Sequence, residues 1–265
     1  MSGAQTNDRS ADGSCGIAVM AKASIPGKAK TRLVPPLTSD EAAAFNTVFL
    51  QDVAANIAAA GEDAAVTCYM AYGPPGSHDF FTANLPAAVG LIESWHANFG
   101  DCLFVAIEQV LARGHGSAVV LNSDSPTLPT ALLVETARLL AQPGDRAVLG
   151  PSSDGGYYLL GLKAPHRRMF ADVAWSTEHV ARQTRERAAE IGLELHLLPE
   201  WYDVDDLPSL QLLHDEIFGR RAFSRRLAPH AARHSAALLD ELLAGTDLAR
   251  RLDRGDAAAA RRAIG

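Results

Sequence analysis

The sequence lacks the features of a disulfide-stapled, zinc-bound or membrane-spanning protein. Its three cysteines, Cys15, Cys68 and Cys102, are odd in number, far apart and without a C-x-x-C pair. They therefore predict neither a disulfide framework nor a zinc site, and we expect small buried apolar residues in a reducing cytoplasm. No apolar run reaches the ~18 residues that a membrane span needs, so we expect no membrane partner. Residues 1–14 lack the apolar core of a signal peptide and predict a disordered tail.

Positive charge and the common nucleotide motifs are also scarce. The formal net charge of -7 argues against a general nucleic-acid binder, because such proteins are usually basic. The sequence has no G-x-G-x-x-G, no P-loop and no G-x-S-x-G elbow, which argues against dinucleotide-binding proteins, P-loop ATPases and α/β-hydrolases. His230 and His234 lie four residues apart, but no Glu lies between them and arginines surround them. A solvated helix face explains this pair better than a zinc site.

What the sequence does contain is a regular alternation of short apolar runs and amphipathic segments. Apolar residues make up 48% of the 265 residues and charged residues 21%, which is typical of an ordinary globular protein. We expect strands at 16–21, 64–71, 89–93, 118–121, 146–150, 157–162 and 194–197, and helices at 39–60, 99–113, 130–141, 177–191, 207–218 and 231–244. This order predicts an α/β fold, a mostly parallel sheet flanked by helices.

The same alternation suggests how the chain is divided. We expect one α/β domain over residues 15–218 and a helical C-terminal extension over 219–265, in which residues 253–264 are helical or frayed. Ser39 is the expected N-cap of the first helix, with acidic residues in its first turn.

The segment Ala118–Pro129 is the first candidate site. Its apolar run stops at Asn122, where Ser123, Asp124 and Ser125 follow, and two prolines then prevent the strand from continuing. A polar cluster in this place lies at the carboxyl edge of the sheet, where open α/β folds bind ligands. A carboxylate flanked by hydroxyls suits Mg²⁺ or Mn²⁺. The alternative is a strand end with an ordinary Asp turn.

The loop after the first strand is strongly basic. Lys22, Lys28, Lys30 and Arg32 place four positive charges in eleven residues without an acidic residue among them. Such charges repel one another unless an anion lies between them, and a phosphate chain is the obvious candidate. The alternative is a solvated surface loop.

A second acidic cluster lies at Asp203-Val204-Asp205-Asp206. On an extended segment Asp203 and Asp205 point to one face, whereas Asp206 is expected to cap the next helix. In an alternating α/β sheet this cluster, the basic loop and Asp124 can share one edge. Carboxylates and cations together suit a complex of a metal ion with a diphosphate.

Two further segments give weaker indications. In Asp154–Tyr158 the paired glycines let the backbone approach a ligand, and Asp154 can accept hydrogen bonds from hydroxyls, although an Asp-Gly hairpin turn explains the pattern as well. Trp175–Thr177 is fully explained by a helix that Ser176 caps and an aromatic side chain staples.

Five segments together resemble a known family. AKASIPGKAKTRL, VVLNSDSPTLP, LGPSSDGGYYLLGL, VAWSTEHV and WYDVDDLPSL occur in the order seen in the bacterial rSAM/selenodomain-associated transferase 1 family of the glycosyltransferase-A superfamily. The resemblance covers roughly Gly16–Phe218. More distantly, the KTRL loop, the Asp after the fourth strand and the DVD segment resemble phospholactate guanylyltransferase and the molybdenum-cofactor guanylyltransferase.

The resemblance implies a Rossmann-like nucleotide-diphospho-sugar transferase domain that binds its nucleotide through Mg²⁺ or Mn²⁺. It implies metal binding by Asp124, Asp203 and Asp205, and phosphate binding by Lys22, Lys28, Lys30, Arg32 and Ser123. The residues expected on the substrate side are Asp154, Gly155, Gly156, Tyr157, Trp175, Ser176 and Thr177. Asp124, Lys30 and Asp154 are the candidates for direct catalytic roles.

Two reactions fit this pattern. The first is glycosyl transfer from a nucleotide sugar to a small acceptor, which the family name favours and which we place first. The second is nucleotidyl transfer, which joins a nucleoside triphosphate to a phosphorylated small molecule and releases pyrophosphate. The basic loop favours the second reaction, because a triphosphate carries more charge. A nucleotide-binding module without turnover is less favoured, because all three charged segments are present. The base, the acceptor and the oligomeric state are not specified by these patterns.

Overall fold

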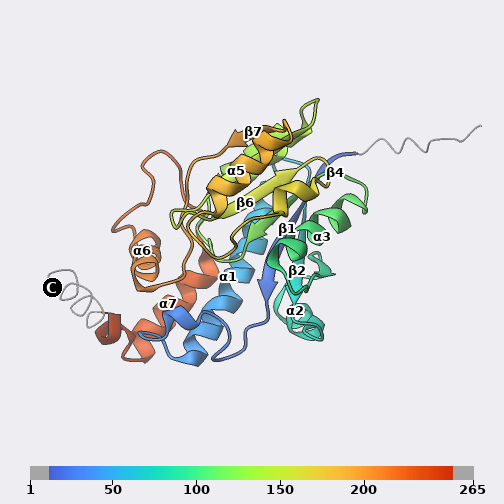
Figure 1. Ribbon diagram of the computed structural model, residues 1–265. Coiled ribbons are helices and arrows are strands. Elements are labelled where there is room, and N and C mark those ends of the chain that lie inside the picture. The colour runs from blue at the N-terminus through green and yellow to red at the C-terminus, as the bar shows by residue number, and fades with distance from the viewer. Residues whose placement is uncertain (1–11, 253–265) are drawn as a thin grey trace, which may run out of the picture.

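A seven-stranded sheet forms the centre of the molecule in the computed structural model, which describes residues 12–252 (Figure 1). Its strands are β1 (Asp12–Lys22), β2 (Val66–Gly73), β3 (Gly90–Glu93), β4 (His115–Asn122), β5 (Arg146–Pro151), β6 (Tyr157–Leu162) and β7 (Glu194–Leu197). They lie in the order β3-β2-β1-β4-β6-β5-β7. All neighbouring strands are parallel except β6, which is antiparallel to both β4 and β5. The expected mostly parallel sheet is therefore confirmed.

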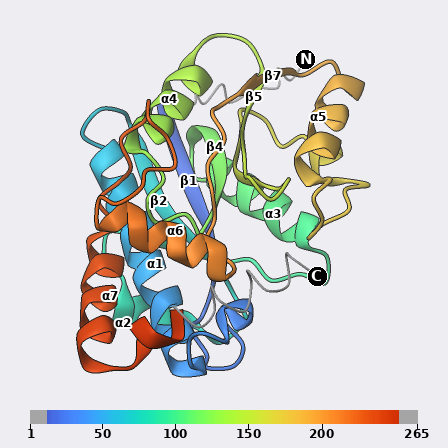
Figure 2. The same ribbon diagram turned by 90° about the vertical axis from the view of Figure 1, so that its left-hand side faces the viewer.

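Helices cover both faces of this sheet (Figures 1 and 2). They are α1 (Ser39–Ala60), α2 (His78–Asn84), α3 (Phe99–Leu111), α4 (Thr130–Ala141), α5 (Val180–Glu190), α6 (Leu207–Ile217) and α7 (Arg233–Gly245), with two short 3-10 helices, η1 (Thr31–Leu33) and η2 (Arg167–Phe170). One hydrophobic core lies on each face of the sheet. The side chains of β1 contribute alternately to the two cores, because successive side chains of a strand point to opposite faces. Ile17 and Val19 join the core with α1 and α4, whereas Ala18 joins the core with α3.

Several local expectations differ from the structure. The strand β1 begins at Asp12, so residues 12–14 belong to the sheet rather than to a tail, and residues 1–11 and 253–264 lie outside the described part of the chain. The sequence pattern did not predict α2. Cys15 and Cys102 are buried as expected, but Cys68 is only partly buried.

The N-terminus of α1 is capped by Thr38 and not by Ser39. The Thr38 hydroxyl accepts a hydrogen bond from the Glu41 amide at 3.2 Å, and the Glu41 carboxylate accepts one from the Thr38 amide at 2.7 Å. This is a capping box, which satisfies two backbone donors at once. Ser39 is instead the first residue of the helix.

The helix expected from Thr177 starts later, at Val180. Ser176 has a φ of 64°, a left-handed conformation, and it does not cap the helix. The Thr177 hydroxyl donates to the Ala174 carbonyl at 2.7 Å, so residues 174–179 form a turn that precedes α5. Ser and Thr prefer local hydrogen bonds to the backbone, both at helix caps and in turns. The sequence therefore suggested a cap at this place, whereas the structure forms a turn.

The helix α7, which lies in the expected C-terminal extension, packs against α1, as the adjacent ribbons show (Figure 2). Asp52 of α1 is fully buried, and its carboxylate accepts hydrogen bonds from the His234 amide at 2.9 Å, the Ser235 amide at 2.8 Å and the Ser235 hydroxyl at 2.6 Å. The negative charge of this carboxylate lies at the N-terminus of α7, where it interacts favourably with the positive end of the helix dipole. Leu239 joins the same core as α1. Among the described residues, no helix combines the length and apolarity needed to cross a membrane.

Candidate functional site

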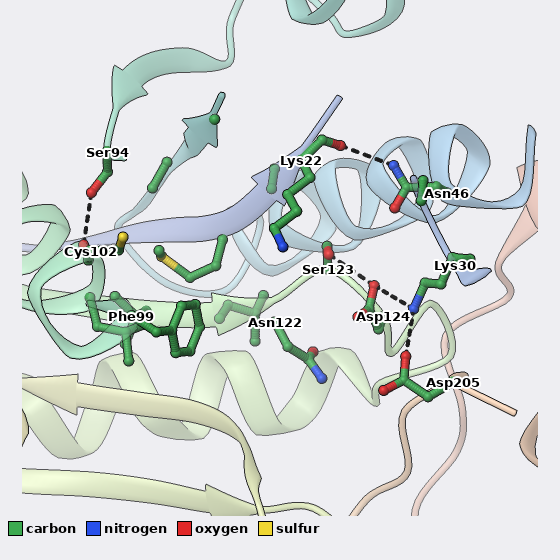
Figure 3. Close-up of a pocket in the computed structure, with 18 of the residues that line it drawn as sticks. Lys22, Lys30, Asn46, Ser94, Phe99, Cys102, Asn122, Ser123, Asp124 and Asp205 are labelled. Atoms are coloured by element: carbon green, nitrogen blue, oxygen red, sulfur yellow. Dashed lines mark hydrogen bonds and ion pairs between the residues drawn. The ribbon is translucent and has the colours of Figure 1, made fainter. Parts of the chain in front are cut away.

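A cavity of about 360 Å³ lies at the carboxyl edge of the sheet, where β1, β2 and β4 end (Figure 3). The loop at residues 22–32 borders it on one side, and the start of α3 borders it on another. Eight of the predicted site residues line it: Lys22, Lys28, Lys30, Arg32, Ser123, Asp124, Tyr157 and Asp205. Seven do not line it: Asp154, Gly155, Gly156, Trp175, Ser176, Thr177 and Asp203.

Lys30 connects the three charged segments. Its ammonium lies 2.8 Å from an Asp124 carboxylate oxygen and 2.9 Å from an Asp205 carboxylate oxygen, and it donates to the Val204 carbonyl at 2.9 Å. The two carboxylates flank the ammonium in Figure 3. Arg32 pairs with the other carboxylate oxygen of Asp205. Residues that are far apart in the sequence therefore meet at one point of the sheet edge.

Electrostatics at this point depend on burial and on the neighbouring charges. Burial by itself would lower the pKa of Lys30, but Asp124 and Asp205 outweigh it and raise that pKa. Burial would likewise raise the pKa of Asp205, but Lys30 and then Arg32 hold that pKa below its usual range. For Asp203, burial and the nearby carboxylates of Asp154, Asp205 and Asp124 raise the pKa to about 7. Three neighbouring carboxylates therefore add to the effect of burial at Asp203.

The loop that carries Asp124 is held in place by the segment that carries Asp205. The Ser125 hydroxyl donates to the Tyr202 carbonyl at 2.8 Å, and the Val204 amide donates to the Asp124 carbonyl at 2.8 Å. The Ser123 hydroxyl donates to the Asp124 carboxylate at 2.9 Å, so this hydroxyl orients the candidate ligand.

Asp206 caps α6, as the sequence predicted. Its carboxylate accepts from the Ser209 amide at 3.0 Å, and the Ser209 hydroxyl accepts from the Asp206 amide at 3.0 Å. Asp206 therefore belongs to the helix start, and Asp205 is the residue of this pair that reaches the cavity.

Lys22 and Lys28 differ from Lys30, because neither makes an ion pair within residues 12–252. Lys22 extends into the cavity in Figure 3, and its ammonium lies 5.7 Å from the centroid of the Trp95 ring. Both lysines are exposed and line the cavity. They are the cations of this loop that remain available to an anion.

Two aromatic residues at the cavity were not predicted from the sequence. Trp95 and Phe99 line it and are 46% and 48% exposed, although large aromatic side chains usually bury more of their surface. The Trp95 ring lies against Gly73, where a Cβ would approach the ring to 2.0 Å. The sequence did contain a signal for them, because both aromatic residues lie in the segment that follows the expected strand at 89–93.

Of the residues expected on the substrate side, Tyr157 lines the cavity, whereas the others lie outside its lining. The Asp154 carboxylate accepts from the Gly156 amide at 2.8 Å, and Gly155 has a φ of 88°, as in a tight turn. Trp175 packs edge-on against Phe99 and Tyr157, with ring centroids 5.5 Å and 6.4 Å apart. Contact between these segments and a substrate stays a prediction.

Metal binding at this edge of the sheet depends on which side chains can act as ligands. Among residues 12–252, no group of three or more His, Cys, Asp or Glu side chains converges in a way that could hold a metal ion by itself. The donors present at this edge are carboxylates, which suit Mg²⁺ and Mn²⁺ in type. Mg²⁺ in particular often binds one or two carboxylates and completes its shell with phosphate oxygens and water. The donor set therefore fits a metal ion that arrives with a nucleotide.

Comparison with known proteins adds a partial family match. The model of a family described as "Uncharacterized protein conserved in bacteria (DUF2064)" matches residues 56–177, which include Asp124 and Asp154. No curated protein matches the sequence. Membership of the rSAM/selenodomain-associated transferase 1 family stays a prediction.

Solved structures resemble nearly the whole chain. One is a protein of Desulfovibrio desulfuricans G20, provisionally described as a nucleotide-diphospho-sugar transferase, with 27% identity, a TM-score of 0.74, and coverage of 90% of this chain and 97% of that chain. Another is a cytidylyltransferase from Leptospira borgpetersenii serovar Hardjo-bovis strain JB197, with 11% identity, a TM-score of 0.51, and coverage of 88% and 95%. The expected fold is confirmed, and both relatives are described as transferases.

Proposed function

We propose that this protein is a transferase that uses a nucleotide-activated donor, and that it moves a sugar from a nucleotide sugar to a small acceptor. The convergence of the basic loop with Asp124 and Asp205 at one cavity carries the proposal. The likeness to the D. desulfuricans protein, which covers 90% of this chain at 27% identity, supports it.

The proposal includes one orientation for the nucleotide in the cavity. Lys22 and Lys28 have no ion-pair partner within the described residues and lie where a diphosphate would need cations, with Arg32 beside them. Trp95 and Phe99 are about half exposed, and aromatic side chains of this kind are suitable for stacking with a planar base. We place the diphosphate at the basic loop and the base at the aromatic residues.

The chemistry required of these residues is mainly electrostatic. In glycosyl transfer the acceptor oxygen bonds to the sugar carbon and loses its proton to solvent, the bond between that carbon and the phosphate oxygen breaks, and the nucleoside diphosphate leaves with an added negative charge. Lys22, Lys28 and Arg32 would stabilise that charge as it develops. Asp124 and Asp205, with Asp203 near them, would hold Mg²⁺ or Mn²⁺, which neutralises phosphate charge when bound.

Nucleotidyl transfer is the second candidate, and one observation favours it. Three exposed cationic side chains, Lys22, Lys28 and Arg32, border the cavity, and a triphosphate has more charge to neutralise than a diphosphate sugar. In that reaction a phosphorylated acceptor would attack the nucleotide, and pyrophosphate would leave.

The leaving group separates the two reactions. The protein would be incubated with Mg²⁺ or Mn²⁺, nucleoside triphosphates, a panel of nucleotide sugars, and small acceptors with and without a phosphate. We expect a nucleoside diphosphate to be released from a nucleotide sugar. Pyrophosphate release that depends on a phosphorylated acceptor would replace the first candidate with the second. If neither a nucleoside diphosphate nor pyrophosphate is released, both transfer reactions are contradicted.

Asp124→Asn tests the site under either reaction. We expect this variant to lose metal-dependent nucleotide binding by about tenfold or more, because one carboxylate charge at the centre of the site disappears. Calorimetric titration with a nucleotide and Mg²⁺ measures it. Asp63→Asn, which changes an exposed carboxylate just after α1, is the control. Equal affinities for the two variants would remove Asp124 from the proposed site.

A further inference from the structure

The ammonium of Lys30 has no hydrogen-bond donor left for a ligand. An ammonium group has three N–H donors, and its three near partners are the Asp124 carboxylate, the Asp205 carboxylate and the Val204 carbonyl. The side chain is only 5% exposed. Lys28, two residues earlier, is exposed and makes no ion pair within the described residues. Of these two lysines in one loop, Lys30 is therefore buried and paired, whereas Lys28 is exposed and has no ion-pair partner among the described residues.

The backbone also holds Lys30 in place. Lys30 has φ 49° and ψ 40°, a left-handed conformation that residues other than glycine rarely adopt. The side chain then passes the Phe49 ring, with the ammonium 5.5 Å from the ring centroid, before it reaches the carboxylates. A buried cation with two carboxylates and a carbonyl around it is an internal counter-ion rather than a free phosphate ligand.

We propose that Lys30 is a built-in counter-cation, which occupies the space between Asp124 and Asp205 and competes with a divalent metal ion for these two carboxylates. This inference rests on the metal site of the proposed function. Two cations cannot share one pair of carboxylates at contact distance without strong repulsion. A metal ion therefore binds poorly to the protein alone, and it binds well when nucleotide phosphates contribute charge and oxygen ligands.

Binding of Mn²⁺ in the absence of nucleotide tests the proposal. Free Mn²⁺ is quantified by electron paramagnetic resonance in titrations of the wild type, Lys30→Met and Lys28→Met. We expect Lys30→Met to bind Mn²⁺ at least about tenfold more tightly than the wild type, because removal of the ammonium exposes two carboxylates. Lys28→Met removes the same charge from the same loop, and we expect it to match the wild type in this nucleotide-free measurement.

Further variants cover a failure to fold, since Lys30→Met removes the ammonium from between two partly buried carboxylates, of which only Asp205 keeps a cationic partner, Arg32, in the described structure. Lys30→Gln keeps a hydrogen-bond donor, and we expect tighter Mn²⁺ binding than in the wild type. Lys30→Arg keeps the cation, and we expect no such gain. In either neutral variant, Mn²⁺ should raise the melting temperature more than it does in the wild type.

Adding a nucleoside diphosphate to the wild type separates failure of the inference from failure of the proposed function. Nucleotide-dependent Mn²⁺ binding by the wild type, without a gain in folded Lys30→Met or Lys30→Gln, overturns the competition and leaves the metal site intact. Nucleotide binding without any Mn²⁺ binding in all variants removes the metal site, and the inference with it. If Lys28→Met gains as much Mn²⁺ affinity as Lys30→Met, the gain is explained by net charge alone. That result would also overturn the proposed competition.

Discussion

Gly73 illustrates how one residue shapes the cavity. It ends β2, and the Trp95 ring lies where any side chain at this position would be, with a built Cβ only 2.0 Å from the ring. Contacts this short are not accommodated without movement of the ring. The absence of a side chain at Gly73 thus sets the position of the aromatic surface on which we propose that the base stacks.

Gly73→Ala should therefore weaken nucleotide binding. We expect the Trp95 ring to shift and nucleotide affinity to fall about tenfold, which corresponds to ~1.4 kcal/mol of binding free energy. Tryptophan emission and a nucleotide titration measure the two effects. Gly13→Ala is the matched control, since no atom lies within 4 Å of a Cβ built there. A shift in emission with unchanged nucleotide affinity would show that the ring does not contribute to binding.

At the scale of single elements, α1 presents a choice between two adjacent capping residues. The sequence favoured Ser39, and the structure assigns the capping box to Thr38 and Glu41. Both residue types make good N-caps, so propensity alone does not distinguish between adjacent candidates.

Alanine substitutions at the two positions should differ in their effect. Thr38→Ala should lower the free energy of unfolding by ~1 kcal/mol, because the Glu41 amide loses its acceptor. Ser39→Ala should change the free energy by only a few tenths of a kcal/mol, because alanine suits a helix interior. Urea unfolding of both variants gives the comparison. If Ser39→Ala loses more free energy of unfolding than Thr38→Ala, Ser39 is the N-cap, as the sequence suggested.

Element positions were predictable where local pattern decides them. The strand at 157–162 and the helices at 39–60 and 130–141 were predicted with the bounds observed. The antiparallel direction of β6 was not predicted, since alternation along one strand carries no information about the direction of its neighbours. Ser176 misled because a serine before an expected helix fits a turn as well as a cap, and here the hydroxyl of the neighbouring Thr177 makes the hydrogen bond of a turn.

The candidate site was predictable in composition but not in pairing. Strand ends placed Asp124 and the basic loop at the same edge, and the structure brings them together. The pairing of Lys30 with Asp205 joins residues 175 positions apart, and no local pattern indicates which of four cations in a loop will be buried. Trp95 was missed because its position depends on the space above Gly73.

At the scale of the whole molecule, an ion pair links the C-terminal part of the described chain to the start of α1. The Arg251 guanidinium donates to both carboxylate oxygens of Glu41, at 2.6 Å and 2.8 Å, and it also reaches the Pro36 carbonyl. The Glu41 side chain is 11% exposed. The hydrogen bonds from Arg251 lower the pKa of Glu41, although partial burial opposes this shift.

This pair predicts a pH dependence of stability. Because the pKa of Glu41 is lower in the folded state, its contribution is fully present above the unfolded value near 4.5 and is lost as the pH falls through the folded value. Arg251→Met should lower the free energy of unfolding at pH 7 by roughly 1–3 kcal/mol. It should also reduce the loss of stability between pH 5 and pH 3, as measured by urea unfolding over a pH series.

Arg250→Met is the matched control for this prediction. Arg250 pairs only with Asp247 in the described structure and is 64% exposed, so its ion pair contributes little. We expect this variant to keep the pH profile of the wild type. Identical profiles for Arg251→Met and the wild type would show that the Glu41 pair does not contribute to acid sensitivity.

The contact of Arg251 with Glu41 also has a consequence for the order of events during synthesis. The helix α1 leaves the ribosome early, but the arginine that completes its start, and the α7 amides that pair with Asp52, are translated much later. The cluster of Lys30, Asp124 and Asp205 likewise waits for residue 205. A nascent chain can therefore form the β1–β2–β4 part of the sheet before it has a working cavity. The nucleotide binding that we propose would thus report that translation has passed residue 205, which makes it a marker of assembly of the sheet edge and not of early collapse.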